Sequence, residues 1–384
     1  MMNHLFPTYA RWEVEPAEAK GTKLIDKNGK EYLDFTSGIG VTNLGHRPES
    51  VQAAITKQLN KFWHVSNLFT QEQQALAAEK LAHASGLAYT FFANSGAEAN
   101  EGAIKLAKKA TGKDKILTFN KSFHGRTIAT MGATGQDKVK QGFGSMLPTF
   151  SHATFNDIES VKSLIDHETA AVMVEVVQGE GGIHLADSAF LEELQQLCQE
   201  YQALLIIDEI QTGIGRTGKP FAFQHYDLQP DIITCAKGLG SGLPIGAIIG
   251  KENLKEYFGP GSHGSTFGGN PLSIASAIAT MEIVFNEDFL SEVNEKAEYL
   301  LEQLKESLYN IEEVTAIRSL GLMIGIEMNT NTASLMQFLR NDGLLTLSAG
   351  ENVLRLLPPL TATVEEINQA VAILKKNIVP VQTA

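Results

Sequence analysis

The sequence has little cysteine, no long apolar run and no excess of positive charge, and each absence excludes a class of protein. Its 384 residues contain two cysteines, Cys198 and Cys235, which are too few for a disulfide framework and lack metal-binding spacing. No apolar stretch approaches the roughly 20 residues that span a bilayer. The segment Met1 to Pro7 lacks the basic and apolar regions of a signal peptide. We therefore expect a cytoplasmic protein with buried thiols and no bound metal.

The charge balance argues against a nucleic acid or an anionic membrane as a partner. The formal net charge is −13, so no broad surface attracts polyanions. Small anionic substrates are not excluded, because a few arginines inside a cleft suffice to bind a carboxylate. Hydrophobic residues make up 43% of the chain and charged residues 20%, which is typical of a globular protein with a large core.

From about residue 90 the chain alternates short apolar strands with amphipathic helices. Most of the expected strands are continuous apolar runs, as in strands covered on both faces: 115–119, 171–177, 204–208, 231–236 and 245–249. This alternation predicts a mostly parallel α/β sheet with crossover helices. After about residue 271 two long helices (271–285 and 287–308) precede short strands and a last helix with the capping box Thr363-Val-Glu-Glu366, which predicts a smaller α+β domain.

No linker rich in proline, glycine or serine separates the two patterns. We expect an N-terminal segment over residues 1–45 that packs with the small domain and contains a hairpin with an Asn28-Gly29 turn. A large domain over residues 46–271 and a small C-terminal domain over residues 272–384 complete the expected organisation.

Lys237 directly follows a short apolar strand and is surrounded by glycines, in the run Asp231-Ile-Ile-Thr-Cys-Ala-Lys-Gly-Leu-Gly. A lysine in a partly dry pocket can lose its charge and attack a carbonyl group. The strand at 204–208 ends in Asp208, 29 positions earlier (237 − 208). Such a pair meets the needs of a pyridoxal phosphate enzyme, because the lysine holds the aldehyde and the aspartate keeps the pyridine nitrogen protonated.

Two segments could hold the phosphate group of such a cofactor. Ser95, Gly96 and Ala97 follow an apolar strand and begin a helix, and the free amides of a helix N-terminus bind anions. Ser265 and Thr266 offer hydroxyl groups in a glycine-rich segment before another helix. Taken alone, each segment is better explained as an ordinary helix cap or a plain turn.

A flat heteroaromatic cofactor also needs an aromatic side chain on one face and an aliphatic side chain on the other. Phe123 can provide the first and Ile210 the second, and Gln211 could hydrogen-bond the ring hydroxyl. The competing interpretations are core packing for Phe123 and Ile210 and a surface amide for Gln211. His124 is more often structural in such a place, and we assign it no role.

Two arginines are candidates for binding the carboxylates of amino acids and oxo acids, because a guanidinium recognises a carboxylate through two hydrogen bonds. Arg126 lies three residues after Phe123. Arg355 interrupts an otherwise apolar strand, where an unpaired charge is costly, so it should face a partner or a cleft. Glu180 is a candidate partner. Most arginines are solvated surface residues, and it is the neighbouring motifs that favour these two.

One motif match is rejected. The segment from Gly213 to Gly218 fits the G-x-G-x-x-G pattern of dinucleotide-binding proteins and follows a strand. That fingerprint needs a helix directly after the glycines and an acid about 20 residues further on. The next residues, Lys219-Pro-Phe-Ala-Phe, do not begin a helix, so we expect no dinucleotide site there.

Together these segments resemble the class III, ornithine-type aminotransferases among the fold-type I pyridoxal phosphate enzymes. The resemblance runs through nearly the whole chain, with six segments in register: Asn94-Ser-Gly-Ala-Glu-Ala-Asn, Ser122-Phe-His-Gly-Arg, Val177-Gln-Gly-Glu-Gly-Gly, Asp208-Glu-Ile-Gln-Thr-Gly, Ala236-Lys-Gly-Leu-Gly and Ser265-Thr-Phe-Gly-Gly-Asn-Pro. The compact length and the segment Arg355-Leu-Leu-Pro-Pro-Leu are most similar to the members that transaminate N2-acetylornithine in arginine biosynthesis.

The resemblance implies a large domain with a mostly parallel, seven-stranded type of sheet, a smaller α+β domain and a homodimer. It implies that Lys237 links covalently to pyridoxal phosphate and moves the proton, and that Asp208 pairs with the pyridinium nitrogen. Phe123 and Ile210 would sandwich the ring. The backbone amides of Gly96 and Ala97 would bind the phosphate.

The resemblance also assigns residues to the neighbouring subunit and to the substrates. Thr266 would reach the phosphate of the adjacent subunit. Arg126 and Ser265 would hold the carboxylate end of acetylornithine. Arg355 would take the α-carboxylate of glutamate or 2-oxoglutarate, and Glu180 would pair with Arg355 while the other substrate is bound.

The residues themselves leave the substrate open. Another class III donor (ornithine, N-succinylornithine, an acylated lysine or 4-aminobutyrate) is one alternative, an aminomutase or racemase is a second, and a non-catalytic cofactor-binding module is a third. The expected pairing of Arg355 with Glu180 argues against the last two, because neither of them needs to bind a separate dicarboxylate acceptor.

Overall fold

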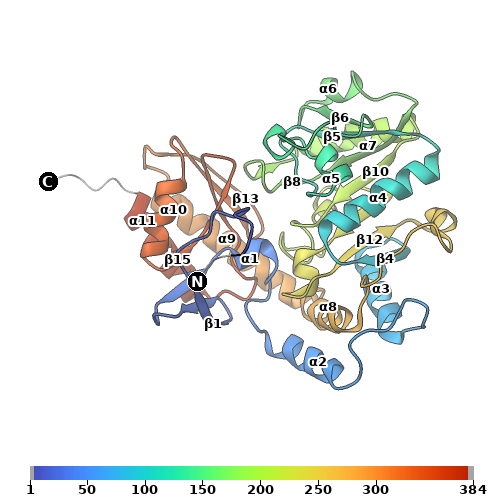
Figure 1. The fold of residues 1–384 in the computed structure, drawn as a ribbon. Coiled ribbons are helices and arrows are strands. Elements are labelled where there is room, and N and C mark those ends of the chain that lie inside the picture. The colour runs from blue at the N-terminus through green and yellow to red at the C-terminus, as the bar shows by residue number, and fades with distance from the viewer. Residues whose placement is uncertain (1–3, 379–384) are drawn as a thin grey trace.

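The computed structural model describes residues 4–378, and Figure 1 shows them as two lobes side by side. The large lobe is built on a seven-stranded sheet. In order across this sheet its strands are β4 (Tyr89–Ala93), β12 (Gly246–Gly250), β11 (Ile232–Cys235), β10 (Leu204–Asp208), β7 (Thr169–Val174), β5 (Lys115–Phe119) and β6 (Phe150–Ala153). β12 runs antiparallel to both neighbours and the other pairings are parallel, so the mostly parallel sheet expected from the sequence is confirmed.

Helices cover both faces of this sheet, which explains why its strands are apolar on both sides. Along β10, Ile206 belongs to the buried cluster that includes Ala103 of α4 (Gly96–Thr111), whereas Leu205 and Ile207 belong to the core on the opposite face. The other helices over this lobe are α2 (Glu49–Leu59), α3 (Glu72–Ser85), α5 (Ile128–Ala133), α6 (Ile158–Lys162), α7 (Ser188–Glu200) and α8 (Pro271–Val284).

The small lobe contains two four-stranded sheets. One joins β1 (Pro16–Lys20), β2 (Lys23–Asp26) and β3 (Glu31–Asp34) to β15 (Leu344–Leu345), and the other consists of β13 (Val314–Leu320), β14 (Met323–Met328), β17 (Val353–Leu356) and β16 (Leu347–Ala349). Its helices are α9 (Glu287–Leu308), α10 (Ala333–Asn341) and α11 (Val364–Ile378). Leu33 of β3 pairs with Leu344 of β15, so strands from near both chain ends share a sheet. The division of the chain at residues 45 and 271 stays a prediction.

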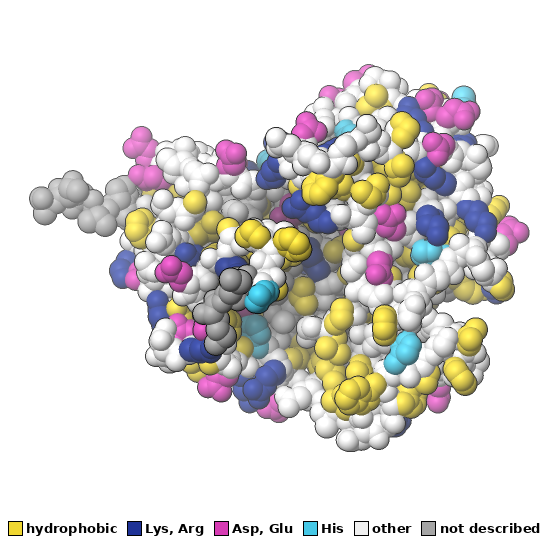
Figure 2. Space-filling view, in the orientation of Figure 1, with side chains coloured by type: hydrophobic (Ala, Val, Ile, Leu, Met, Phe, Trp, Pro, Cys, Tyr) yellow, Lys and Arg dark blue, Asp and Glu magenta, His cyan; other side chains and the backbone are white. Residues whose placement is uncertain are grey.

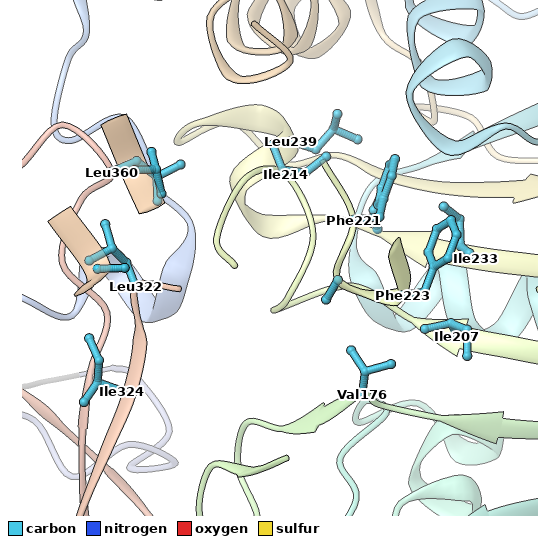
Figure 3. Packing of buried hydrophobic residues seen from close by; sticks show 14 of the residues in the cluster. Val176, Ile207, Ile214, Phe221, Phe223, Ile233, Leu239, Leu322, Ile324 and Leu360 are labelled. Carbon is cyan, nitrogen blue, oxygen red and sulfur yellow. The ribbon is translucent and has the colours of Figure 1, made fainter. Parts of the chain in front are cut away.

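A single apolar core crosses the boundary between the lobes. Ile214 and Leu239 of the large lobe and Leu322 and Leu360 of the small lobe are almost completely buried and belong to one cluster (Figure 3). At the same boundary a Cβ atom on Gly321 would lie 2.4 Å from the carbonyl carbon of Thr217. The loop after β10 is therefore packed tightly against the turn between β13 and β14.

Three further observations concern cysteines, metals and membranes. Both cysteines are buried and unpaired. Within residues 4–378 no group of three or more histidine, cysteine, aspartate or glutamate side chains could hold a metal ion. None of the helices in that range is long and apolar enough to cross a bilayer.

Candidate active site

The segments that follow β5, β7, β10 and β11 border a cavity of about 460 Å³ at the carboxyl edge of the large sheet. Most of the site residues predicted from the sequence line this cavity: Ser95, Gly96, Ala97, Phe123, Arg126, Glu180, Asp208, Ile210, Gln211 and Lys237. Arg355 does not line the cavity itself but hydrogen-bonds the lining residues Glu180 and Gln211. Ser265 and Thr266 do not line this cavity and border a separate pocket. The sheet thus brings together residues that are more than a hundred positions apart, because parallel strands end at the same edge.

Lys237 begins a short 3₁₀ turn (Lys237–Gly240) directly after β11. Its φ is +42°, in the left-handed region that a residue with a side chain occupies only at a cost. Burial lowers the pKa of the Lys237 amine, and the Arg355 charge adds to this effect. The carboxylates of Glu180 and Asp208 act in the opposite direction and do not cancel it. The amine is therefore easier to deprotonate than an ordinary lysine.

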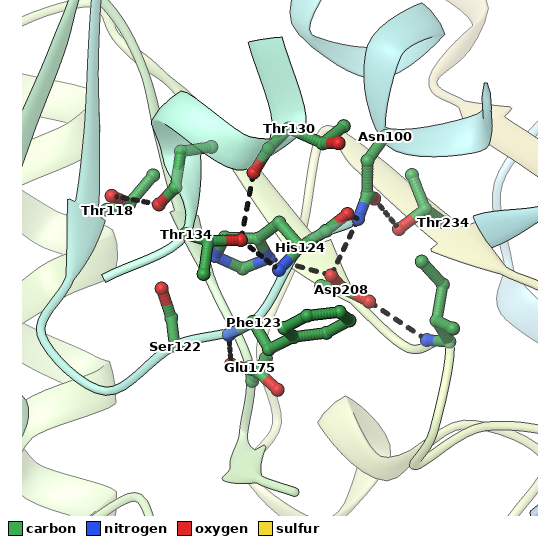
Figure 4. A network of polar contacts seen from close by, with 12 residues as sticks. Asn100, Thr118, Ser122, Phe123, His124, Thr130, Thr134, Glu175, Asp208 and Thr234 are labelled. Carbon is green, nitrogen blue, oxygen red and sulfur yellow. Dashed lines mark hydrogen bonds and ion pairs between the residues drawn. The ribbon is translucent and has the colours of Figure 1, made fainter. Parts of the chain in front are cut away.

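Asp208 ends β10 and is buried at the centre of a polar network (Figure 4). Its Oδ2 accepts hydrogen bonds from Asn100 Nδ2 at 2.8 Å and from His124 Nδ1 at 2.7 Å, and its Oδ1 accepts one from the amide of Ile210 at 3.0 Å. Asn100 also accepts from the Thr234 hydroxyl at 2.7 Å. These contacts fix the carboxylate at the cavity wall before any ligand arrives.

His124 and Glu175 surround this carboxylate with two further titratable groups. Burial opposes charge on His124, but the hydrogen bond to Asp208 and the negative charges of Asp208 and Glu175 outweigh burial and raise its pKa. Burial raises the pKa of Glu175 to about 8, with the Asp208 charge adding and His124 opposing. Glu175 lines the cavity and accepts a hydrogen bond from the Phe123 amide at 3.0 Å. It therefore releases its proton at higher pH than an ordinary glutamate.

The N-terminus of α4 opens into the same cavity. Ser95 caps this helix, since its hydroxyl accepts from the amide of Glu98 at 3.2 Å, as the sequence predicts. The first amides of a helix have no partner within it, so those of Gly96 and Ala97 are available to an anion. Ile210 packs directly on Gly96, where a Cβ atom would lie 2.7 Å from its Cδ1. A larger residue than glycine would displace Ile210.

Phe123 and Arg126 lie together at the cavity wall, as expected from their spacing. The guanidinium carbon of Arg126 is 5.6 Å from the centre of the Phe123 ring, which is the geometry of a cation–π contact. Phe123 is therefore held from one side by a charged group and from its backbone by Glu175.

Glu180 and Arg355 form an ion pair that spans the two lobes. Glu180 lies in the turn between the short strands β8 (Val177–Gln178) and β9 (His184–Leu185), and Arg355 lies on β17. The Nη1 atom of Arg355 is 2.6 Å from Glu180 Oε1 and 2.9 Å from Gln211 Oε1. Burial alone would raise the pKa of Glu180, but the charges of Arg355 and Lys237, together with the hydrogen bonds from Arg355 and Gln211, outweigh burial and lower it. The amide of Gln211 is thus engaged with this ion pair.

Ser265 and Thr266 lie on a loop at the surface of the large lobe. Ser265 Oγ accepts a hydrogen bond from Asn94 Nδ2 at 3.0 Å, and Asn94 lines the cavity. Thr266 borders a separate shallow pocket with His64, Ser66 and Asn67. Within its own chain, Thr266 is not part of the cavity that holds Lys237.

The sequence interpretation missed Asn100, His124 and Glu175. Asn100 carried a signal, because it is a polar residue on the apolar face of α4, between Ala99 and Ala103. Glu175 carried another, because it is an acidic residue that directly follows the apolar strand β7. His124 gave no signal of its own, since its partner Asp208 is 84 positions away.

Comparisons with known proteins agree with this geometry. Residues 8–378 match the sequence profile described as aminotransferase class III. The chain belongs to the class III aminotransferase family. Among curated class III relatives it is 57% identical over 378 residues to the acetylornithine aminotransferase of Bacillus subtilis, covering 98% of both chains, and 54% identical over 376 residues to that of Bacillus anthracis, covering 98% of this chain and 97% of the relative.

Solved structures of aminotransferases have the same fold. An ornithine aminotransferase from Toxoplasma gondii, described with pyridoxal phosphate at partial occupancy, superposes with a TM-score of 0.93 at 30% identity, covering 98% of this chain and 92% of that chain. The N-acetylornithine aminotransferase from Stenotrophomonas maltophilia gives a TM-score of 0.84 at 34% identity, covering 96% of both chains. The cofactor of this class III aminotransferase is pyridoxal phosphate.

The cavity residues fit this cofactor chemically. A lysine amine with a lowered pKa suits an aldehyde, a buried aspartate suits a protonated ring nitrogen, and the free amides of α4 suit a phosphate. All three groups line one cavity of about 460 Å³.

Proposed function

We propose that this class III aminotransferase transfers the terminal amino group of N2-acetyl-L-ornithine to 2-oxoglutarate, yielding N-acetyl-L-glutamate 5-semialdehyde and L-glutamate in arginine biosynthesis, and that it works in the cytoplasm. The observation that carries the proposal is the ion pair between Glu180 and Arg355 at the cavity wall. Relatives at 52–57% identity that bear the name acetylornithine aminotransferase support the choice of donor.

Lys237 and Asp208 have the central chemical roles in this proposal. When bound, pyridoxal phosphate supplies an aldehyde that condenses with amines and a ring that withdraws electrons. Lys237 provides the amine for the covalent link and then holds and moves the proton at the substrate carbon that bears the amino group. Asp208, fixed by His124 and Asn100, keeps a negative charge at the ring nitrogen.

The remaining cavity residues would hold the cofactor and the donor. The amides of Gly96 and Ala97, with the hydroxyl of Ser95, would bind the phosphate, and Phe123 and Ile210 would pack on opposite faces of the ring. Gln211 would reach the ring hydroxyl in addition to its contact with Arg355. Arg126, together with Ser265, would bind the carboxylate end of acetylornithine.

The ion pair of Glu180 and Arg355 would allow one site to bind two substrates that differ in charge next to the reacting carbon. One site must accept a terminal amine and afterwards an α-amino acid, and only the second substrate brings an α-carboxylate next to the reacting carbon. With Arg355 neutralised by Glu180, no free charge meets the methylene chain of the first substrate. A glutamate carboxylate would displace Glu180 and take the guanidinium through two hydrogen bonds.

We further propose a homodimer in which Thr266 reaches the phosphate of the neighbouring subunit. Thr266 lies beside an apolar surface patch that consists of Phe62, Trp63, Leu68, Phe69 and Phe267. Leu68 is 92% exposed and Phe69 is 65% exposed. Figure 2 shows hydrophobic side chains gathered over the region of α2. Exposed apolar patches of this kind mark association surfaces.

The proposed donor is tested by half-reactions. The enzyme loaded with pyridoxal phosphate is mixed with single amines in the absence of an acceptor, and conversion of the cofactor to its amine form is followed by absorbance. We expect fast conversion by N2-acetyl-L-ornithine and by L-glutamate, slow conversion by ornithine and 4-aminobutyrate, and none in Lys237→Ala. Isomerisation of a substrate without consumption of 2-oxoglutarate would instead identify an aminomutase.

A further inference from the structure

Arg318 ties the turn that carries Glu180 to the small lobe. Arg318 lies on β13, and its Nη2 and Nε donate to the carbonyl oxygens of Gly182 at 2.8 Å and of Ile183 at 3.1 Å. Its Nη1 pairs with Glu327 on β14, which fixes the guanidinium. Both accepting carbonyls follow Glu180 by two and three positions, across two glycines that would otherwise leave the turn free.

Arg216 makes the reciprocal connection. It lies on the loop after β10 in the large lobe, is 2% exposed, and donates through Nη1 to the carbonyl oxygens of Leu322 at 3.1 Å and of Pro358 at 2.5 Å. Pro358 follows Arg355 by three positions and lies two residues beyond the end of β17. Among residues 4–378 no acidic group offsets the burial of Arg216, and its Nη2 has no partner. A buried, unneutralised guanidinium is costly, so a contribution beyond stability is worth seeking here.

Each member of the ion pair is therefore held in place by an arginine of the opposite lobe. Glu180 belongs to the large lobe and its turn is held by Arg318 of the small lobe. Arg355 belongs to the small lobe, and the segment directly after its strand is held by Arg216 of the large lobe. Neither of these two arginines lines the cavity.

We propose that Arg318 and Arg216 are positioning residues that set the balance between the paired and the separated state of Glu180 and Arg355, and thereby the preference of the enzyme between a terminal amine and an α-amino acid. The proposal rests on the function assigned above to Glu180 and Arg355. Arg318 favours the paired state, because it keeps Glu180 within reach of Arg355. Arg216 favours binding of an α-carboxylate, because it keeps Arg355 aimed at the cavity.

Removal of Arg318 and removal of Arg216 should change the substrate preference in opposite directions. Removing Arg318 frees the Glu180 turn and exposes Arg355 more often, so the efficiency with glutamate rises relative to that with acetylornithine. Removing Arg216 displaces Arg355, so the relative efficiency with glutamate falls. A charge-assisted hydrogen bond to a carbonyl contributes enough for a change of about tenfold in each direction.

The experiment measures the cofactor-loaded enzyme in two separate half-reactions, one with N2-acetyl-L-ornithine and one with L-glutamate, for Arg318→Met and Arg216→Met. The quantity compared is the ratio of the two kcat/KM values. We expect the ratio of glutamate to acetylornithine to increase about tenfold in Arg318→Met and to decrease about tenfold in Arg216→Met. In Arg318→Lys and Arg216→Lys the lysine still donates to one carbonyl, so the ratio of the two kcat/KM values should lie between those of the methionine variant and the wild type.

Arg340→Met is the matched control, because Arg340 contacts the ring of Trp12 and lies away from the ion pair. Its ratio should equal that of the wild type. If loss of Arg318 and of Arg216 lowers both half-reactions equally, the residues are merely structural and the proposal is overturned. Should Arg216→Met fail to fold, Arg216→Lys and Arg318→Met decide the question. If the wild type itself rejects acetylornithine, the proposed donor is wrong, and the ratio is measured against the terminal amine that it accepts.

Discussion

His124 Nδ1 lies 2.7 Å from Asp208 Oδ2, and both side chains are shielded from solvent. Burial opposes charge on the imidazole, but the hydrogen bond to Asp208 and the nearby negative charges outweigh burial and raise the pKa of His124, so the ring holds a second proton more readily than an ordinary histidine. The contact fixes the orientation of the Asp208 carboxylate inside the protein. A carboxylate that is already oriented needs no reorganisation when a cationic ring binds beside it.

Replacing Asp208 by asparagine should slow transamination by about 10²–10³-fold, because the amide retains the shape of the carboxylate but not its charge. The measurement is kcat with N2-acetyl-L-ornithine and 2-oxoglutarate at saturating cofactor. Glu209→Gln is the matched control: Glu209 is also buried, but its carboxyl accepts from the Phe223 amide at 2.7 Å and does not line the cavity. Near-normal kcat in Asp208→Asn would contradict the role assigned to this residue.

Replacing His124 by asparagine should destabilise the protein more at acidic than at alkaline pH. The pKa of His124 is raised in the folded protein, so its favourable interaction with Asp208 is fully present below the unfolded value of 6.5 and disappears as pH rises through the folded value. Urea unfolding of wild type and variant at about pH 6 and about pH 9 measures the difference. A destabilisation that grows with pH would show that the imidazole is neutral.

Replacing Glu175 by glutamine should stabilise the protein at alkaline pH and change little at acidic pH. Burial raises the pKa of Glu175 from 4.5 to about 8, so the stability that its proton provides is complete below 4.5 and is lost as pH rises to about 8. Glutamine keeps an oxygen for the Phe123 amide and cannot ionise. Melting temperatures of both proteins measured across this range should diverge as pH rises, and parallel curves would refute the assignment.

Mixing two defective subunits should restore activity if Thr266 serves the neighbouring site. In a mixed dimer of Lys237→Ala and Thr266→Ala, one of the two sites combines an intact lysine with an intact threonine. Random exchange of subunits then yields about a quarter of the wild-type activity. The two variants are assayed alone, mixed, and mixed after Leu68→Asp has been introduced into both to disrupt the apolar patch. No recovery on mixing would place Thr266 in its own subunit or outside the site.

The elements of the large lobe could be predicted because their signals are local. The apolar runs at β5 and β10 coincide with the expected strands, and the Ser95 cap and the capping box of Thr363 and Glu366 form as their spacing predicts. Ser95, Asp208 and Lys237 could be placed at one site because strand ends of a parallel sheet share an edge.

The residues that support the site without lining it could not be predicted, because their partners are distant in the sequence. In several cases the partner is a backbone carbonyl group, which leaves no signal in the sequence. Asn100 meets Asp208 across 108 positions, and Arg318 meets Gly182 across 136 positions. Nothing local to Arg216 separates it from an exposed arginine in a glycine-rich loop. Its burial depends on Leu322 and Pro358 of the other lobe, which only the tertiary structure brings near.

The apolar contact of Ile214 and Leu239 with Leu322 and Leu360 has a consequence for engineering. Swinging the lobes widely apart would hydrate these four side chains, so ligand entry has to rely on local rearrangement of turns. A chimera that takes its C-terminal half from a relative with a different donor preference should take the residues on both sides of this apolar contact from the same parent. If the two sides come from different parents, poor packing between the lobes, rather than altered substrate recognition, will dominate the measured change in activity.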